Sequence, residues 1–105
     1  MLTRLNIDII YIVNFEWDED KNRRNRHKHK VWFEEATQVF ADPRAIQYDD
    51  PEHSEDEDRF IMLGIASSGR LLVVIHCYRE NEETTRIISA RRAKPKEERI
   101  YEKGI

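Results

Sequence analysis

The residues of this 105-residue chain that could do chemistry are cations, histidines and one tyrosine. Histidine exchanges a proton near neutral pH, and arginine can bind two phosphate oxygens at once. RNA is cleaved without a metal when a base removes the 2′-hydroxyl proton, an acid protonates the leaving 5′-oxygen, and cations stabilise the phosphorane. His76 or His29 are the candidate acid or base. Arg91 and Arg59 are the candidate phosphate ligands, and Tyr101 would line the site. Further RNA contacts are expected from Lys28, Arg92 and Lys94.

Each of these residues also has a structural interpretation. His76 ends an apolar run, so a buried, hydrogen-bonded imidazole explains it as well as catalysis does. His29 lies at the end of an expected helix, where a cation complements the helix dipole. Tyr101 stands at helical spacing and fits core packing. Arg91 and Arg92 are neighbours in an expected strand and point to opposite faces, so at most one of them belongs to the site.

Spacing excludes several other kinds of site. The sequence has no Gly-rich phosphate loop, no His-Glu-x-x-His pair, no Gly-x-Ser-x-Gly elbow and no Cys/His zinc spacing. The acidic stretch 47–58 lacks the ligand spacing and central glycine of a calcium loop. A single cysteine, Cys77, excludes an intramolecular disulfide and favours a reducing compartment. We therefore expect no metal and no cofactor.

Charge is unevenly distributed along the chain. The net charge is −3, yet residues 21–30 contain no Asp or Glu and residues 47–58 contain no Lys or Arg. A basic surface of this kind can follow phosphates while an acidic loop stays away from them. The apolar N-terminal stretch is interrupted by Asp8 and fits neither a signal peptide nor a membrane span, so we expect a cytoplasmic protein with no membrane contact.

The length predicts one small α+β domain, with residues 1–11 as an N-terminal extension and residues 12–105 as the domain. Strands are expected at 9–15, 45–48 and 59–66, followed by a Ser-Ser-Gly turn and a hairpin of 71–79 with 86–93. Asp18 is a good N-cap for a helix that ends at about residue 29. A second helix is expected over 33–41, and Pro95 begins a C-terminal helix.

The two faces of the hairpin follow from the alternation of side chains. The residues Leu71, Val73, Ile75 and Cys77 are all apolar and are expected to face the core. Burial of Ile88 and Ala90 in the partner strand would then place His76 and Arg91 together on the exposed face. A register slip of one residue would reverse this assignment.

The link between the first two helices lacks the usual capping residues. Lys30 occupies the position where glycine would end the first helix, and Trp32 stands where serine or threonine would cap the second. Trp32 must therefore contribute by packing or by contacting something outside the chain. We expect a partner surface formed by Trp32, Arg23 and Arg26, with an acidic partner segment covering the cationic face.

Several blocks of the sequence occur in the order found in one known family. These blocks are FEWDEDK (15–21), KHKVWFEEA (28–36), VFADP (39–43), the acidic stretch to Phe60, GRLLVV (69–74) and RIISARRA (86–93). Together they closely resemble the BrnT family of toxins, over about residues 12–104. The family commonly has glycine at the position of Lys30 and serine at that of Trp32.

The resemblance implies an α+β, RelE-like fold: an antiparallel sheet with two helices after the first strand and a C-terminal helix. It further implies a metal-independent endoribonuclease that acts as the toxin of a type II toxin–antitoxin system. A BrnA-like antitoxin with a ribbon-helix-helix part would neutralise it in a hetero-oligomer and bind operator DNA, so that both proteins repress their own operon. The alternative is a diverged, noncatalytic module that binds the antitoxin or RNA.

Overall fold

The computed structural model describes residues 14–53, 57–79 and 83–104. The expected N-terminal extension and most of the strand expected at 9–15 lie outside these residues. The elements follow in the order β1 (Asn14–Glu16), α2 (Glu19–His29), α3 (Phe33–Ala36), η1 (Thr37–Ala41), β2 (Ile46–Asp49), η2 (Pro51–His53), β3 (Phe60–Ile65), β4 (Leu71–Tyr78), β5 (Thr84–Arg92) and α4 (Pro95–Lys103). The predicted α+β class is confirmed.

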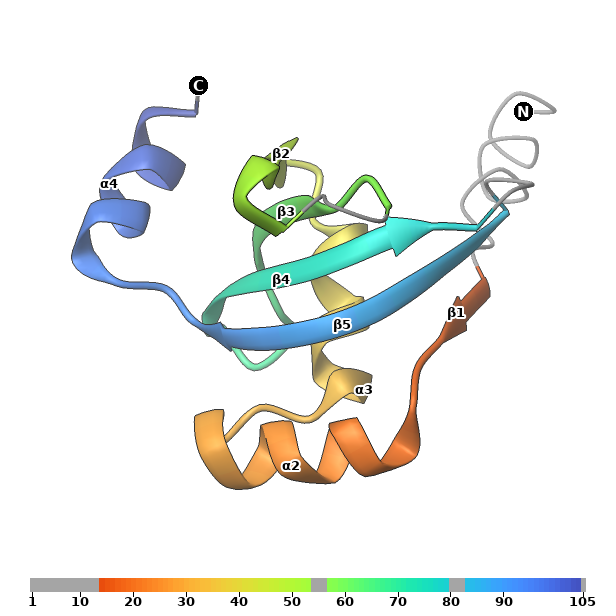
Figure 1. The fold of residues 1–105 in the computed structure, drawn as a ribbon. Coiled ribbons are helices and arrows are strands. Elements are labelled where there is room, and N and C mark those ends of the chain that lie inside the picture. Colours follow the sequence, from red (N-terminus) through yellow and green to blue (C-terminus); the bar gives the residue numbers. More distant parts are fainter. Residues whose placement is uncertain (1–13, 54–56, 80–82, 105) are drawn as a thin grey trace, which may run out of the picture.

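The strands form one sheet in the order β1-β5-β4-β3-β2. Among the described strands, β1 runs parallel to its neighbour, β5, and the other pairs are antiparallel. In Figure 1, α2 and α3 lie below and behind β4 and β5, whereas α4 lies beyond the end of β5. One side of the sheet therefore carries the N-terminal helices and the other side is only partly covered.

The helices begin where the sequence predicts. The Asp18 carboxylate accepts hydrogen bonds from the backbone of Asp20 and Lys21 at the start of α2, and Lys30 ends this helix with φ of 63°. Pro95 occupies the first turn of α4. The helix expected over 33–41 is instead divided into α3 and the 3₁₀ helix η1. Tightening of a last helical turn into 3₁₀ geometry is common and explains the difference.

The expected assignment of the two sheet faces is wrong. The main core packs α2, α3 and η1 against the face that bears Leu72, Val74, Ile87 and Ala90, which we name the covered face. Leu63 and Val73 pack with Tyr101 of α4 on the opposite side, which we name the α4 face. The error has a physical cause, because both side-chain columns of β4 begin with apolar residues and alternation alone does not say which column the helices cover.

A β-bulge between Ile75 and His76 shifts the pairing of β4 with β5. His76 pairs with Ile87, so that Ile87 rather than Ile88 is buried against the helices, while Ala90 is buried as expected. The insertion of one residue in β5 cannot be read from side-chain alternation in the sequence.

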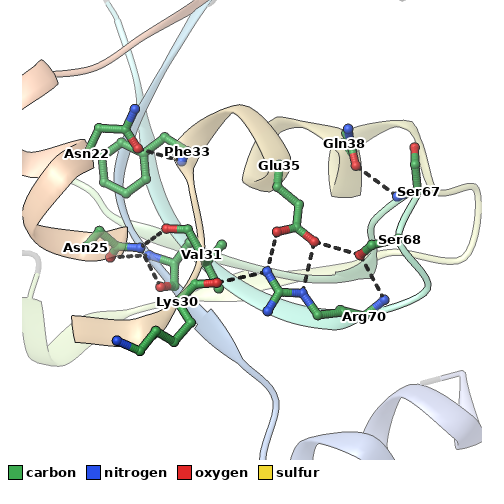
Figure 2. Close-up of polar contacts among 11 residues, drawn as sticks. Asn22, Asn25, Lys30, Val31, Phe33, Glu35, Gln38, Ser67, Ser68 and Arg70 are labelled. Atoms are coloured by element: carbon green, nitrogen blue, oxygen red, sulfur yellow. Dashed lines mark hydrogen bonds and ion pairs between the residues drawn. The ribbon is translucent and has the colours of Figure 1, made fainter. Parts of the chain in front are cut away.

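Two buried asparagines of α2 attach this helix to the rest of the fold (Figure 2). The Asn25 amide donates to the backbone oxygens of Val31 (2.8 Å) and Ala90 (2.9 Å), and its Oδ1 accepts from the Ala90 N–H (3.1 Å). Asn22 Oδ1 accepts from the Phe33 N–H at 2.7 Å. Asn22 therefore supplies from α2 the N-terminal cap for α3 that Trp32 does not provide.

An ion pair joins the β3–β4 turn to α3, and a hydrogen bond joins the same turn to the link between α2 and α3. Arg70 pairs with Glu35 of α3 and donates to the Lys30 carbonyl at 3.0 Å, and Ser68 also donates to Glu35 at 2.6 Å. Figure 2 shows these side chains converging from the turn and from α3. The contacts hold the helical layer in a fixed position on the sheet.

Candidate functional site: the α4 face of the sheet

An ion pair between Arg91 and Glu97 stands at one end of the α4 face. Arg91 pairs with Val73 across β4 and β5 and therefore shares its face. The guanidinium donates to both carboxylate oxygens of Glu97, at 2.8 and 2.6 Å. These bonds lower the pKa of Glu97 and raise that of Arg91. The Arg91 side chain keeps 34% of its surface exposed, so it can meet a ligand without any change of fold.

Tyr48 of β2 lies on the same face, packed beside Leu63 and Val73. Burial, and after it the negative charge of Glu97, raises the pKa of the Tyr48 phenol, while Arg91 lowers it. The phenol is therefore within electrostatic reach of the Arg91–Glu97 pair. Tyr48 and Glu97 are not among the site residues predicted from the sequence. The sole signal for Glu97 is its position three residues after the helix cap, and β2 is too short for its pattern to mark Tyr48.

His29 is half-buried at the last residue of α2. Burial lowers its pKa, and the charges of Lys28 and Arg91 lower it further, so the imidazole is neutral at pH 7. The influence of Arg91 places His29 within electrostatic reach of the same guanidinium. Of the two candidate histidines, His29 is thus the one that the fold brings near Arg91.

His76 lies on the covered face with no exposed surface, so the expectation that it shares an exposed face with Arg91 is wrong. Its ring packs against Phe40, Phe60 and Tyr78, and its Nε2 lies 3.0 Å from Gln47 Oε1. Burial lowers the pKa of His76 to about 4. The bulge and the packing of η1 explain this placement, which the apolar run alone does not reveal.

Tyr101 is nearly buried, and its hydroxyl donates to Asp42 Oδ2 at 2.6 Å. The Arg44 guanidinium lies over its ring, 5.4 Å from the centroid. Asp42 also accepts from the backbone N–H groups of Arg44 and Ile65. Tyr101 therefore ties α4 to the segment between η1 and β2, which agrees with its packing interpretation.

The remaining candidate cations are dispersed around the sheet. Arg59 precedes β3, and its Nε lies 3.6 Å from Glu57 Oε1. Its positive charge lowers the pKa of Cys77 on the neighbouring strand, against the larger opposite effect of burial. Arg92 and Lys94 are exposed between β5 and α4, and Lys28 is exposed near the end of α2. Arg92 and Lys94 thus follow Arg91 along the chain at the end of β5, and Lys28 adjoins His29 at the end of α2, whereas Arg59 lies at the other end of the sheet along the strands.

The expected partner surface surrounds Trp32, which keeps 44% of its surface exposed. Arg26 lies over its indole ring at 5.6 Å from the centroid, and Arg23 is exposed and paired with Asp20. A shallow hollow beside the ring is lined by Glu19, Glu34, Glu35 and Gln38. The surroundings of Trp32 therefore carry both signs of charge and are less cationic than the sequence led us to expect.

Within residues 14–53, 57–79 and 83–104, no three His, Cys, Asp or Glu side chains are grouped so as to hold a metal ion. No helix in the same segments is long and apolar enough to cross a membrane.

Comparisons with known proteins define the class. A family model described as "Ribonuclease toxin, BrnT, of type II toxin-antitoxin system" matches residues 17–97. The crystal structure of the Brucella abortus ribonuclease toxin BrnT superposes with a TM-score of 0.61 at 23% identity, covering 78% of this chain and 97% of that one. A search of curated proteins found no match.

The match places this chain among the ribonuclease toxins of type II toxin–antitoxin systems. Within that class the chain belongs to the BrnT family, as the blocks of the sequence indicate. A type II toxin has an antitoxin as its partner, and this holds for the present chain.

Proposed function

We propose that this toxin is a metal-independent endoribonuclease that cleaves RNA on the α4 face, beside the Arg91–Glu97 ion pair, and thereby inhibits growth. The observation that carries the proposal is a partly exposed guanidinium, held by Glu97 beside an apolar sheet surface, whose charge also acts on His29. Arg91 would bind the phosphate, since its planar guanidinium matches phosphate geometry. Glu97 is a positioning residue that holds this guanidinium in one orientation.

In this proposal His29 is the base. Its neutral imidazole accepts the 2′-hydroxyl proton as the 2′-oxygen forms a bond to phosphorus. The bond from phosphorus to the 5′-oxygen then breaks, and the leaving oxygen takes a proton from water or from the imidazolium. The products are a 2′,3′-cyclic phosphate and a 5′-hydroxyl. Lys28, Arg92 and Lys94 extend the positive surface along the RNA, and Arg59 binds it at the opposite end of the face.

Cleavage of a synthetic RNA by the purified full chain in EDTA tests this proposal. The expected result is strand scission with cyclic-phosphate ends, lost in Arg91→Ala and reduced about 100-fold or more in His29→Gln. His27→Gln is the matched control, because His27 is exposed on the same last turn of α2. Binding of RNA without cleavage would overturn the proposal in favour of the noncatalytic module, and dependence on an added metal would overturn the metal-independent mechanism.

We further propose that the antitoxin is BrnA-like and has a ribbon-helix-helix part. The toxin–antitoxin pair binds operator DNA only through this part, and it works in the cytoplasm. Exposed Trp32, with Arg26 over its ring and Arg23 on the adjacent turn, supports an antitoxin contact on this surface. Trp32→Ala should weaken antitoxin binding at least 10-fold. Ile65→Ala, which removes a comparably exposed apolar side chain elsewhere, should not. Equal affinities of the two variants would contradict this assignment.

A further inference from the structure

The hydroxyl of Tyr48 differs from the other tyrosine hydroxyls of the described segments. Tyr78 donates to Gln47 at 2.6 Å and Tyr101 donates to Asp42 at 2.6 Å. Tyr48 has its ring packed on the apolar part of the α4 face, yet its hydroxyl makes no hydrogen bond within residues 14–53, 57–79 and 83–104. A tyrosine ring packed in this way usually directs its hydroxyl to a partner. The hydroxyl is thus available to a ligand on this face.

The surroundings of Tyr48 fix its chemical role as a donor. Burial raises the pKa of the phenol, and the negative charges of Glu97 and Asp50 act in the same direction against the opposing effect of Arg91. The phenol therefore keeps its proton throughout the neutral range. A neutral phenol near a guanidinium offers a second hydrogen-bond donor to any anion that approaches the cation.

The sheet determines the space between these two donors. Tyr48 pairs with Ile61 of β3, Ile61 with Ile75 of β4, and Ile75 with Ser89 of β5. Arg91 lies two residues beyond Ser89 on β5, so the usual strand spacing and rise put its backbone roughly 16 Å from that of Tyr48. Both long side chains stand on the same face, with apolar side chains between their strands.

We propose that Tyr48 is a catalytic residue of this toxin, whose hydroxyl donates a hydrogen bond to a non-bridging oxygen of the scissile phosphate while Arg91 binds another. The inference rests on the proposed ribonuclease function of the α4 face and adds a substrate contact to it. No proton leaves the phenol. Negative charge grows on the non-bridging oxygens in the phosphorane, so the hydrogen bond strengthens in the transition state.

A donor of this kind affects the cleavage rate more than the affinity for RNA. Tyr48→Phe keeps the ring and its packing but removes the hydroxyl, so it should lower the single-turnover rate at saturating RNA by about 100-fold. Its affinity for a fully 2′-O-methylated RNA, which cannot be cleaved, should change less than threefold. The pH dependence of the residual rate should match that of wild type, because the phenol does not exchange its proton.

Tyr78→Phe is the matched control, since it removes a hydroxyl from the covered face, and it should cleave at the wild-type rate. If wild type cleaves RNA, Arg91→Ala does not, and Tyr48→Phe cleaves at the full rate, this inference is overturned and the proposed function is left intact. No cleavage by wild type would overturn both. Equal losses of cleavage rate in Tyr48→Phe and Tyr78→Phe would indicate a general structural effect and would also overturn the inference. Urea unfolding of each variant would show the corresponding loss of stability.

Discussion

Acid should destabilise this protein through one buried side chain, His76. Its ring is enclosed by Phe40, Phe60 and Tyr78, and burial lowers its pKa from 6.5 to about 4. In the unfolded chain the pKa returns to about 6.5. Between these two values the unfolded state binds more protons than the folded state. The free energy of unfolding therefore falls as the pH decreases from 6.5 toward 4.

The magnitude follows from the gap between the two pKa values, which corresponds to about 3 kcal/mol. This is a large part of the 5–15 kcal/mol or so that separates folded from unfolded states in typical domains. The groups that surround the ring do not titrate in this window, because Gln47 is neutral and Tyr78 is a phenol. The effect is therefore assigned to the imidazole itself.

Urea unfolding at pH 7 and pH 4, followed by tryptophan fluorescence, measures the effect in wild type and in His76→Phe. Between the two pH values wild type should lose about 3 kcal/mol more than the variant. Carboxylates such as Glu35 and Glu97 titrate in both proteins and cancel in this comparison. Parallel pH profiles of the two proteins, or an NMR titration of the His76 ring near pH 6.5, would refute the reasoning.

Three further substitutions test the packing of the helices on the sheet, each by urea unfolding at pH 7. Asn25→Ala leaves the buried N–H and C=O of Ala90 without their partner and should cost about 3 kcal/mol; a loss below 1 kcal/mol would contradict the role of this amide. Gly64→Ala places a Cβ 3.1 Å from Val39 and should cost about 1–3 kcal/mol. An unchanged stability would show that η1 can shift away from β3 at little cost. Lys30→Gly relieves a φ of 63° and should stabilise the fold by about 1 kcal/mol; a destabilised variant would show that the Lys30 side chain matters more than its backbone.

Local signals in the sequence predicted the elements well. Asp18, Pro95 and the turn at Gly69 each mark a boundary through a short-range preference, and the structure has a boundary at each of them. The assignment of the faces failed because it depends on which helices pack where. The first residues of β4 are apolar on both sides, and the bulge beside His76 shifts the residue of β5 with which His76 pairs.

The candidate site was only partly predictable. Arg91 and His29 were chosen for their chemistry, but their proximity depends on how α2 packs along β5. Tyr48 approaches Arg91 from β2, with strands β3 and β4 between them, and Glu97 approaches it from α4, after the turn that follows β5. The proximity of these three residues is a property of the tertiary fold. Short-range preferences carry no information about it.

The side chain of Asn25 also affects how the sheet ends. Beyond its short pairing with β1, strand β5 would present the N–H and C=O of Ala90 as an unpaired edge. The Asn25 amide donates to the Ala90 C=O and accepts from the Ala90 N–H, as the backbone of a neighbouring strand would. A second chain therefore cannot extend the sheet at this point without first displacing α2. One asparagine thus protects the edge against the strand-to-strand association that leads to aggregation.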